Sequence, residues 1–250
     1  MNEKYALVTH VLDFVGPPAV KALLESGHCV VAQDPAFQDD RKKREYEASH
    51  PGTIAVGLRD PEQLIRYAWE NERKVDVLVS NDTYPAIHVP VEDADVADLR
   101  ATIDAVLVYP FKLLQSAIPR LKQQGGGNVI LITSCRTELP LPNGAIPDIA
   151  RAGANALVKS LSIELAPYRI PVNAIAPNYL YSEAYFPQAK FIDDPVGREF
   201  IRQVVPAGRL GDPEEIGELV NYLANMKGSF HTGTIIKFAG GWPAAPKRPV

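Results

Sequence analysis

Short apolar runs recur along the first third of the chain, and a segment with helical character follows each of them. The runs read YALVT at 5–9, HCVVAQD at 28–34, TIAVGL at 53–58 and VDVLVS at 75–80. They lack polar alternation, which is typical of strands in a parallel sheet that helices cover on both faces. The pattern therefore predicts an α/β fold.

The rest of the chain continues the alternation of helices and strands. The expected elements are a helical region over about 93–124, the strand NVILIT at 128–133, a helix over 148–168, the strand PVNAIA at 171–176, a helix near 213–225 and the strand TIIKF at 234–238. Together with the first four runs they predict a seven-stranded parallel sheet. We expect a single doubly wound, Rossmann-like domain that spans residues 1–250.

The composition excludes several classes of function. A hydrophobic content of 46% over 250 residues is enough for one large core, and a net charge of −4 with scattered Lys and Arg disfavours nucleic acid as a partner. No apolar run approaches the ~20 residues of a membrane span, and the N-terminal MNEKYALVTH lacks the layout of a signal peptide. Two cysteines are too few for a metal quartet. We expect a cytoplasmic protein with no metal and no membrane partner.

The predicted strands place five chain segments at one edge of the sheet. In open parallel sheets, ligands bind beyond the carboxyl ends of the strands. Those ends are Thr9–Phe14, Asp34, Ser80–Asp82, Ser134 and Pro177–Leu180. We therefore expect the ligand site in the crevice where these segments meet.

The turn after the first strand argues against a dinucleotide. Such a site needs glycines, so that backbone N–H groups can approach the pyrophosphate. Here the turn reads HVLDFVGPP, in which Pro17 and Pro18 have no N–H, Phe14 adds a bulky ring and Asp13 adds a repelling charge. Asp34 is the counter-evidence, because an acid at the end of the second strand commonly binds ribose, although a plain loop aspartate is an equal alternative. We predict no NAD(P) binding and no cofactor.

The segment from the fifth strand to the following helix holds a spaced set of chemical groups. Ser134 closes the strand, position 147 follows 13 residues later, and Arg151 comes four residues after that. This spacing resembles the active-site segment of the short-chain dehydrogenases/reductases, where a serine is followed by a tyrosine and then by a cation. The cation is lysine in the redox enzymes and arginine in the halohydrin dehalogenases. The serine and the arginine are in register here, but Pro147 stands at the tyrosine position.

Further motifs make the resemblance specific to the halohydrin dehalogenases. They are the first turn THVLDFVGPPAV, the strand end VLVSND, the segment ITS and the loop APNYLYSEAYFP, with the closing RLGDPEEIGELVNYLA and FAGGW shared by the wider superfamily. Halohydrin dehalogenases are cofactor-free relatives of the reductases that convert a vicinal halohydrin to an epoxide and release halide. The resemblance therefore implies a lyase that acts on a small-molecule halohydrin or epoxide.

The resemblance also implies a halide site. Phe14 matches the family's aromatic residue of the first turn, and Pro177, Asn178, Tyr179 and Leu180 match the loop that completes the halide nest. Successive backbone N–H groups beside an aromatic edge suit a weakly hydrated anion. The alternative for the loop is a turn with a core tyrosine.

Three residues match the family's catalytic groups. Ser134 matches the serine that hydrogen-bonds the substrate oxygen, and Arg151 matches the catalytic cation. Asp82 matches a buried aspartate that links this arginine to solvent, and we expect its carboxylate to pair with Arg151. The alternatives are a turn cap for Ser134 and a helix N-cap for Asp82.

Pro147 leaves the proton acceptor unassigned, because proline cannot take a proton. Asp148 and His10 are conceivable substitutes, as are three tyrosines on loops that reach the crevice: Tyr84, Tyr179 and Tyr181. Three functions therefore stay open: a halohydrin dehalogenase-like enzyme, a catalytically silent binding protein and an NAD(P)-dependent oxidoreductase. Superfamily members pair through two long helices, so the resemblance implies a homotetramer, or at least a dimer.

Overall fold

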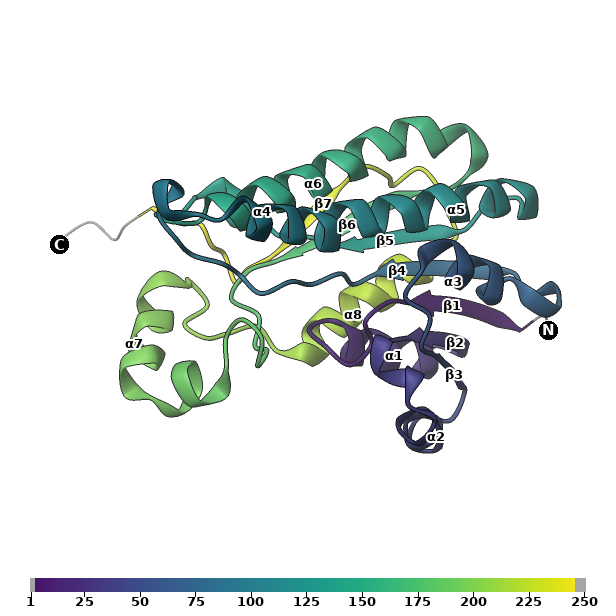
Figure 1. Cartoon of the computed structure of the whole chain (residues 1–250), viewed down its shortest axis with the longest axis horizontal. Helices are drawn as coiled ribbons and strands as arrows, with labels where there is room; N and C mark the ends of the chain where they lie inside the picture. The colour runs from purple at the N-terminus through teal and green to yellow at the C-terminus, as the bar shows by residue number, and fades with distance from the viewer. Residues whose placement is uncertain (1–2, 246–250) are drawn as a thin grey trace.

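Seven parallel strands form the central sheet of the computed structural model, which describes residues 3–245 (Figure 1). Their order is β3-β2-β1-β4-β5-β6-β7. The bounds are β1 Lys4–Val8, β2 His28–Gln33, β3 Thr53–Val56, β4 Val75–Ser80, β5 Asn128–Ile132, β6 Val172–Pro177 and β7 Ile235–Phe238. The predicted seven-stranded parallel sheet is confirmed. The strand order reverses between β1 and β4, so the crevice of a doubly wound sheet lies at their carboxyl ends.

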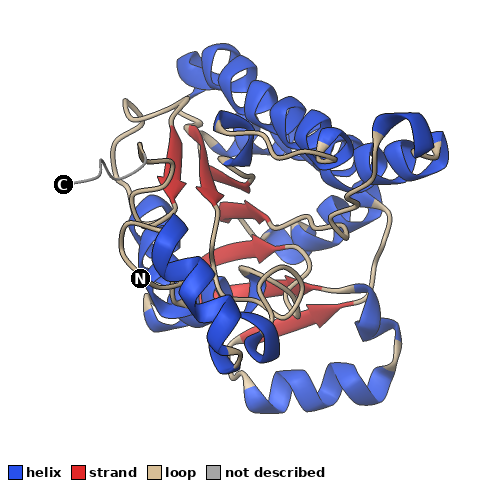
Figure 2. Ribbon diagram, turned by 90° about the vertical axis from the view of Figure 1, so that its left-hand side faces the viewer, coloured by secondary structure: helices blue, strands red, loops and turns tan. Residues whose placement is uncertain are grey.

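Helices cover both faces of the sheet (Figures 1 and 2). Their bounds are α1 Gly16–Glu25, α2 Asp40–Ser49, α3 Pro61–Ala68, α4 Val96–Ile103, α5 Tyr109–Gln124, α6 Ala145–Leu165, α7 Pro195–Val204 and α8 Pro213–Ala224. Side chains of α1, α2 and α8 join one hydrophobic cluster, and side chains of α3, α5 and α6 join a second one across the sheet. The domain therefore has three layers.

Successive residues of the central strands enter opposite clusters. In β1, Ala6 and Val8 face the layer that holds α1 and α8, whereas Leu7 faces the layer that holds α3, α5 and α6. Val79 and Leu78 divide in the same way on β4. Because side chains alternate along a strand and both faces are buried, most positions are apolar. This accounts for the runs without polar alternation.

The long helical region is continuous from Val96 to Gln124 and contains a π-helical turn between α4 and α5. By length and composition this helix is apolar enough to cross a membrane, a weak signal that the core helix of a soluble domain also gives. Leu113, Leu114, Ala117 and Leu121 of α5 are buried in the second cluster. This helix is therefore a core element of the layered domain.

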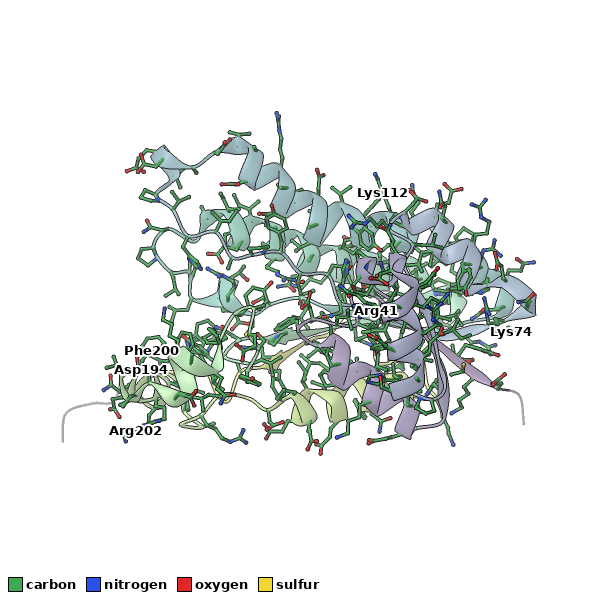
Figure 3. All side chains as sticks on the ribbon, turned by 60° about the horizontal axis from the view of Figure 1, so that its bottom comes forward. Arg41, Lys74, Lys112, Asp194, Phe200 and Arg202 are labelled. Atoms are coloured by element: carbon green, nitrogen blue, oxygen red, sulfur yellow. The ribbon has the colours of Figure 1, made fainter. Side chains whose placement is uncertain are left out.

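The segment between β6 and α8 forms a lobe that the sequence analysis did not predict. It contains α7, and its side chains include the labelled Asp194, Phe200 and Arg202 at one end of the molecule (Figure 3). Ile201 and Val205 anchor it in a third cluster together with residues that follow β5, β6 and β7. The Asp194 carboxylate caps α7 by accepting a hydrogen bond from the N–H of Val196.

Helix α6 begins at Ala145, three residues before the predicted start. Pro147 therefore lies inside the first turn and does not precede the helix. Proline is tolerated there, because the first N–H groups of a helix have no partner within the helix. Arg151 consequently lies in the second turn of α6, where it is buried beneath the crevice.

Candidate active site

A largely apolar cavity of about 290 Å³ lies at the carboxyl ends of the strands, where the predicted strand ends placed a crevice. It gathers nine of the residues singled out in the sequence: Phe14, Tyr84, Ser134, Pro147, Arg151, Pro177, Asn178, Tyr179 and Leu180. Side chains from other segments complete the wall, among them Val106, Leu141, Tyr185, Phe186, Phe200 and Trp242. Asp82 lies behind this wall and does not line the cavity.

The turn between β1 and α1 uses its N–H groups for its own fold. The N–H of His10 donates to the side-chain oxygen of Gln33 at 3.0 Å, and the N–H of Gly16 donates to Asp13 O at 2.8 Å. Gly16 is required by close packing, because a Cβ there would lie 2.5 Å from His10 O. Pro17 follows at the start of α1. The glycine thus serves the tight turn, and these donors are not directed at a phosphate.

The Asp34 carboxylate likewise hydrogen-bonds to the backbone of the chain itself. One carboxylate oxygen accepts from the N–H of Leu12 at 3.3 Å, and the other accepts from the N–H of Ala36 at 2.9 Å. Beyond β2, the rings of Phe37 and Tyr46 pack with centroids 4.8 Å apart in the core. The residues at this end of the sheet therefore do not fit a dinucleotide.

The loop after β6 leaves fewer N–H groups free for an anion than the sequence suggested. The N–H of Asn178 donates to Phe238 O at 3.0 Å, and the N–H of Tyr179 donates to the side-chain oxygen of Asn178 at 3.0 Å. In the described part of the chain, the N–H of Leu180 is the one of these loop donors without such a bond. The aromatic wall comes from Phe14, whose φ of 52° is in the left-handed region. Such backbone strain is often found at ligand sites.

Ser134 connects β5 to this loop. The residue is 8% exposed, and its hydroxyl donates to Pro177 O at 3.2 Å and accepts from the N–H of Arg136 at 3.2 Å. The second bond is the turn cap considered as its alternative role. The adjacent Thr133 is 1% exposed, and its buried hydroxyl has no hydrogen-bond partner among the described residues. A buried hydroxyl on a cavity wall without a partner favours a polar ligand or water beside it.

Arg151 is a buried cation that lies against neutral oxygens. Its guanidinium, in a residue 8% exposed, donates to Asp82 O and Ile132 O at 3.3 Å each, and to the Tyr185 hydroxyl at 3.4 Å. No carboxylate of the described residues lies within 4.0 Å of it. A buried charge without a counterion favours an anion in the neighbouring cavity.

The expected ion pair between Arg151 and the Asp82 carboxylate is wrong. This carboxylate accepts from the Thr9 hydroxyl at 3.1 Å, lies 3.0 Å from His10 Nδ1 and also accepts from the Ser80 hydroxyl. Thr9 and His10 beyond β1, together with Ser80 at the end of β4, thus hold the carboxylate away from Arg151, which reaches the main-chain oxygen of Asp82. Burial alone would lower the pKa of His10, but the hydrogen bond and charge of Asp82 outweigh it, so that this pKa is raised.

Of the other substitute proton acceptors named from the sequence, Tyr84 lines the cavity, whereas Asp148, Tyr181 and Tyr179 have other contacts. Asp148 forms an ion pair with Arg136, and the Tyr181 hydroxyl donates to Glu183 at 2.8 Å outside the cavity. Tyr179 packs between Phe186 and Trp242, and burial raises the pKa of its phenol.

Sequence reasoning missed Tyr185, whose hydroxyl reaches Arg151 from the loop after β6. The sequence signal was weak: this tyrosine is one of several aromatic residues in YLYSEAYFP.

The chain matches known proteins along nearly its whole length. A family profile described as enoyl-(acyl carrier protein) reductase matches residues 16–243. Among solved structures, a halohydrin dehalogenase bound to ethyl (2S)-oxiran-2-ylacetate is 33% identical, with 98% of this chain and 100% of that chain covered and a TM-score of 0.94. Another, named a dehalogenation enzyme, is 32% identical, with 96% of this chain and 98% of that chain covered and a TM-score of 0.92. Dehydrogenase/reductase SDR family member 4 of Homo sapiens is 28% identical over 98% of this chain and 89% of its own length.

Proposed function

Because the chain belongs to the short-chain dehydrogenase/reductase superfamily and its first turn does not fit a dinucleotide, we propose that it is a cofactor-independent, halohydrin dehalogenase-like lyase. It interconverts vicinal halohydrins and epoxides with release or uptake of halide. The observation that carries the proposal is the buried Arg151 cation, which lies beside an apolar cavity and has no carboxylate within 4.0 Å in the described chain. The similarity to the two dehalogenase structures supports it.

Ring closure needs three things from this cavity. The hydroxyl oxygen of the halohydrin must be held, and Ser134 is placed to exchange its bond to Pro177 O for one to this oxygen. The halide must be received, for which the Leu180 N–H and the edge of Phe14 are available. The charge that develops must be stabilised, and a preorganised guanidinium inside a water-poor cavity does this effectively. The apolar wall accepts the carbon skeleton.

The proposal is tested by following halide release from a panel of aliphatic and aromatic chlorohydrins and bromohydrins, and azide consumption with the matching epoxides. The unmodified chain should turn over at least one of them, and Arg151→Met should lose the activity. Thermal unfolding of the variant shows whether it still folds. Absence of turnover across the panel by a folded protein would contradict the lyase assignment.

The second candidate is a binding protein that has lost its chemistry, and Pro147 favours it because the family's phenol is missing there. Such a protein would bind halide or epoxide in the same cavity without releasing product. Calorimetric binding of an epoxide, measured beside the turnover assay, separates the two candidates.

A further inference from the structure

The turn that carries Tyr185 is held in a fixed shape. The N–H of Tyr185 donates to the Ser182 hydroxyl at 3.2 Å, and the N–H of Phe186 donates to Ser182 O at 2.9 Å. The Tyr185 ring meets the Phe14 ring edge-on, with centroids 5.1 Å apart. Two backbone bonds and one aromatic contact therefore orient the phenol toward the cavity.

The Tyr185 hydroxyl bonds to two other segments. It accepts from Arg151 Nη2 at 3.4 Å and donates to the main-chain oxygen of Tyr84 at 2.9 Å. The guanidinium is positioned to stabilise a negative charge on this oxygen, because opposite charges attract strongly where water is scarce. The residue lines the same cavity as Ser134 and Pro147, and it is only partly buried, so its proton can exchange with solvent.

We propose that Tyr185 is the catalytic proton-transfer residue of this site, in place of the phenol that Pro147 lacks. The inference rests on the proposed function and assigns its base. In ring closure, the halohydrin hydroxyl transfers its proton to the Tyr185 phenolate. The halohydrin oxygen then forms the new C–O bond to the adjacent carbon, and the C–halogen bond breaks with its electron pair on the halide. No atom is oxidised or reduced.

In the reverse direction, the neutral Tyr185 hydroxyl exchanges its bond to Tyr84 O for one to the epoxide oxygen. It donates its proton as the C–O bond breaks and an anion attacks the ring carbon. Arg151 stabilises the phenolate that results. The pair thus consists of a phenol and a cation, with the phenol supplied by the loop after β6 and the cation by α6.

The first test compares two tyrosine hydroxyls of the same loop in the full chain. Tyr185→Phe keeps the ring against Phe14 and should lower kcat for halide release about 10²–10⁴-fold, the usual contribution of general acid–base catalysis. KM should change little. The matched control is Tyr181→Phe, which removes a hydroxyl bound to Glu183 outside the cavity and should leave kcat unchanged.

A second test does not depend on removing the hydroxyl. Incorporation of 3,5-difluorotyrosine at position 185 retains the phenol but makes it more acidic, so the rise of kcat with pH for ring closure should move to lower pH. A residue that only supports the fold would not shift this profile. Adding Pro147→Tyr to the Tyr185→Phe variant should restore part of the lost rate, whereas Pro147→Phe in the same background should not.

The outcomes separate the two proposals. If the unmodified chain turns over no halohydrin or epoxide, the proposed function and the role of Tyr185 both fail. If the unmodified chain is active but Tyr185→Phe keeps its kcat, or fluorination leaves the pH profile in place, the assignment of Tyr185 is overturned while the proposed function stands.

Discussion

We expect the contact between His10 and Asp82 to make the stability of this fold depend on pH. His10 Nδ1 lies 3.0 Å from a carboxylate oxygen of Asp82, and the two side chains are 25% and 3% exposed. His10→Asn removes the charge while keeping a short amide that can donate. Asparagine also tolerates the left-handed backbone at this position, where φ is 48°. The variant thus isolates the effect of the imidazolium.

The direction in which stability changes with pH follows from the raised pKa of His10 in the folded state. Its stabilising contribution is fully present below the ordinary histidine value of 6.5 and is lost as the pH rises through the folded value. A hydrogen bond to a charged group contributes about 1.5–3 kcal/mol. At pH 6 we expect the unfolding free energy of His10→Asn to be lower by about this amount, which corresponds to a fall in Tm of roughly 3–12 °C for a chain of this size.

Urea unfolding of both proteins at pH 6 and pH 9 measures the effect. The difference in unfolding free energy between them should shrink at pH 9, where His10 is neutral. His28→Gln serves as a control in which the effect of pH on the stability difference should be opposite, because burial lowers the pKa of His28. A His10→Asn difference that stays the same at both pH values would refute the assigned role of the charge.

Three further outcomes are expected. Bromide-soaked crystals should show an anomalous peak near Phe14 and the Leu180 N–H, and fluoride should bind more weakly than bromide, because an apolar nest recovers little of its hydration energy; peaks only outside the cavity would contradict the halide site. Micromolar NADH should cause no saturable quenching of Trp242, a residue of the cavity wall; saturable quenching would restore the oxidoreductase candidate. Sedimentation equilibrium should show a homotetramer, or at least a dimer, of 27.4 kDa chains; a purely monomeric profile would exclude both.

The sheet was predictable because each of its positions is constrained by burial. Strands covered on both faces require continuous apolar residues, and such runs are visible in a single sequence. Helix α7, of whose ten residues only Gly197 and Ile201 are buried, was not predicted. Its position depends on contacts with distant segments, for which a local pattern gives no signal.

The site likewise has some features that could be predicted from the sequence and others that could not. The register of Ser134 and Arg151 was visible because their spacing is fixed by one strand, one loop and one helix. The direction of the Asp82 carboxylate was not, since it depends on His10, which lies 72 positions away. Tyr185 was missed for the same reason, because its bond to Arg151 joins residues 34 positions apart. Hydrogen bonds between remote segments leave no periodic trace in a sequence.

The first turn, which bonds to Gln33 and Asp34, has a consequence for how the proposed reaction would be controlled in a cell. A reductase of this fold responds to the ratio of its reduced and oxidised nicotinamide pools. Under the proposed function, a chain that binds no nicotinamide would have no such input. Its net direction would be set by mass action among halohydrin, epoxide, halide and protons, so that salinity and acidity would act on it as the redox balance acts on its relatives.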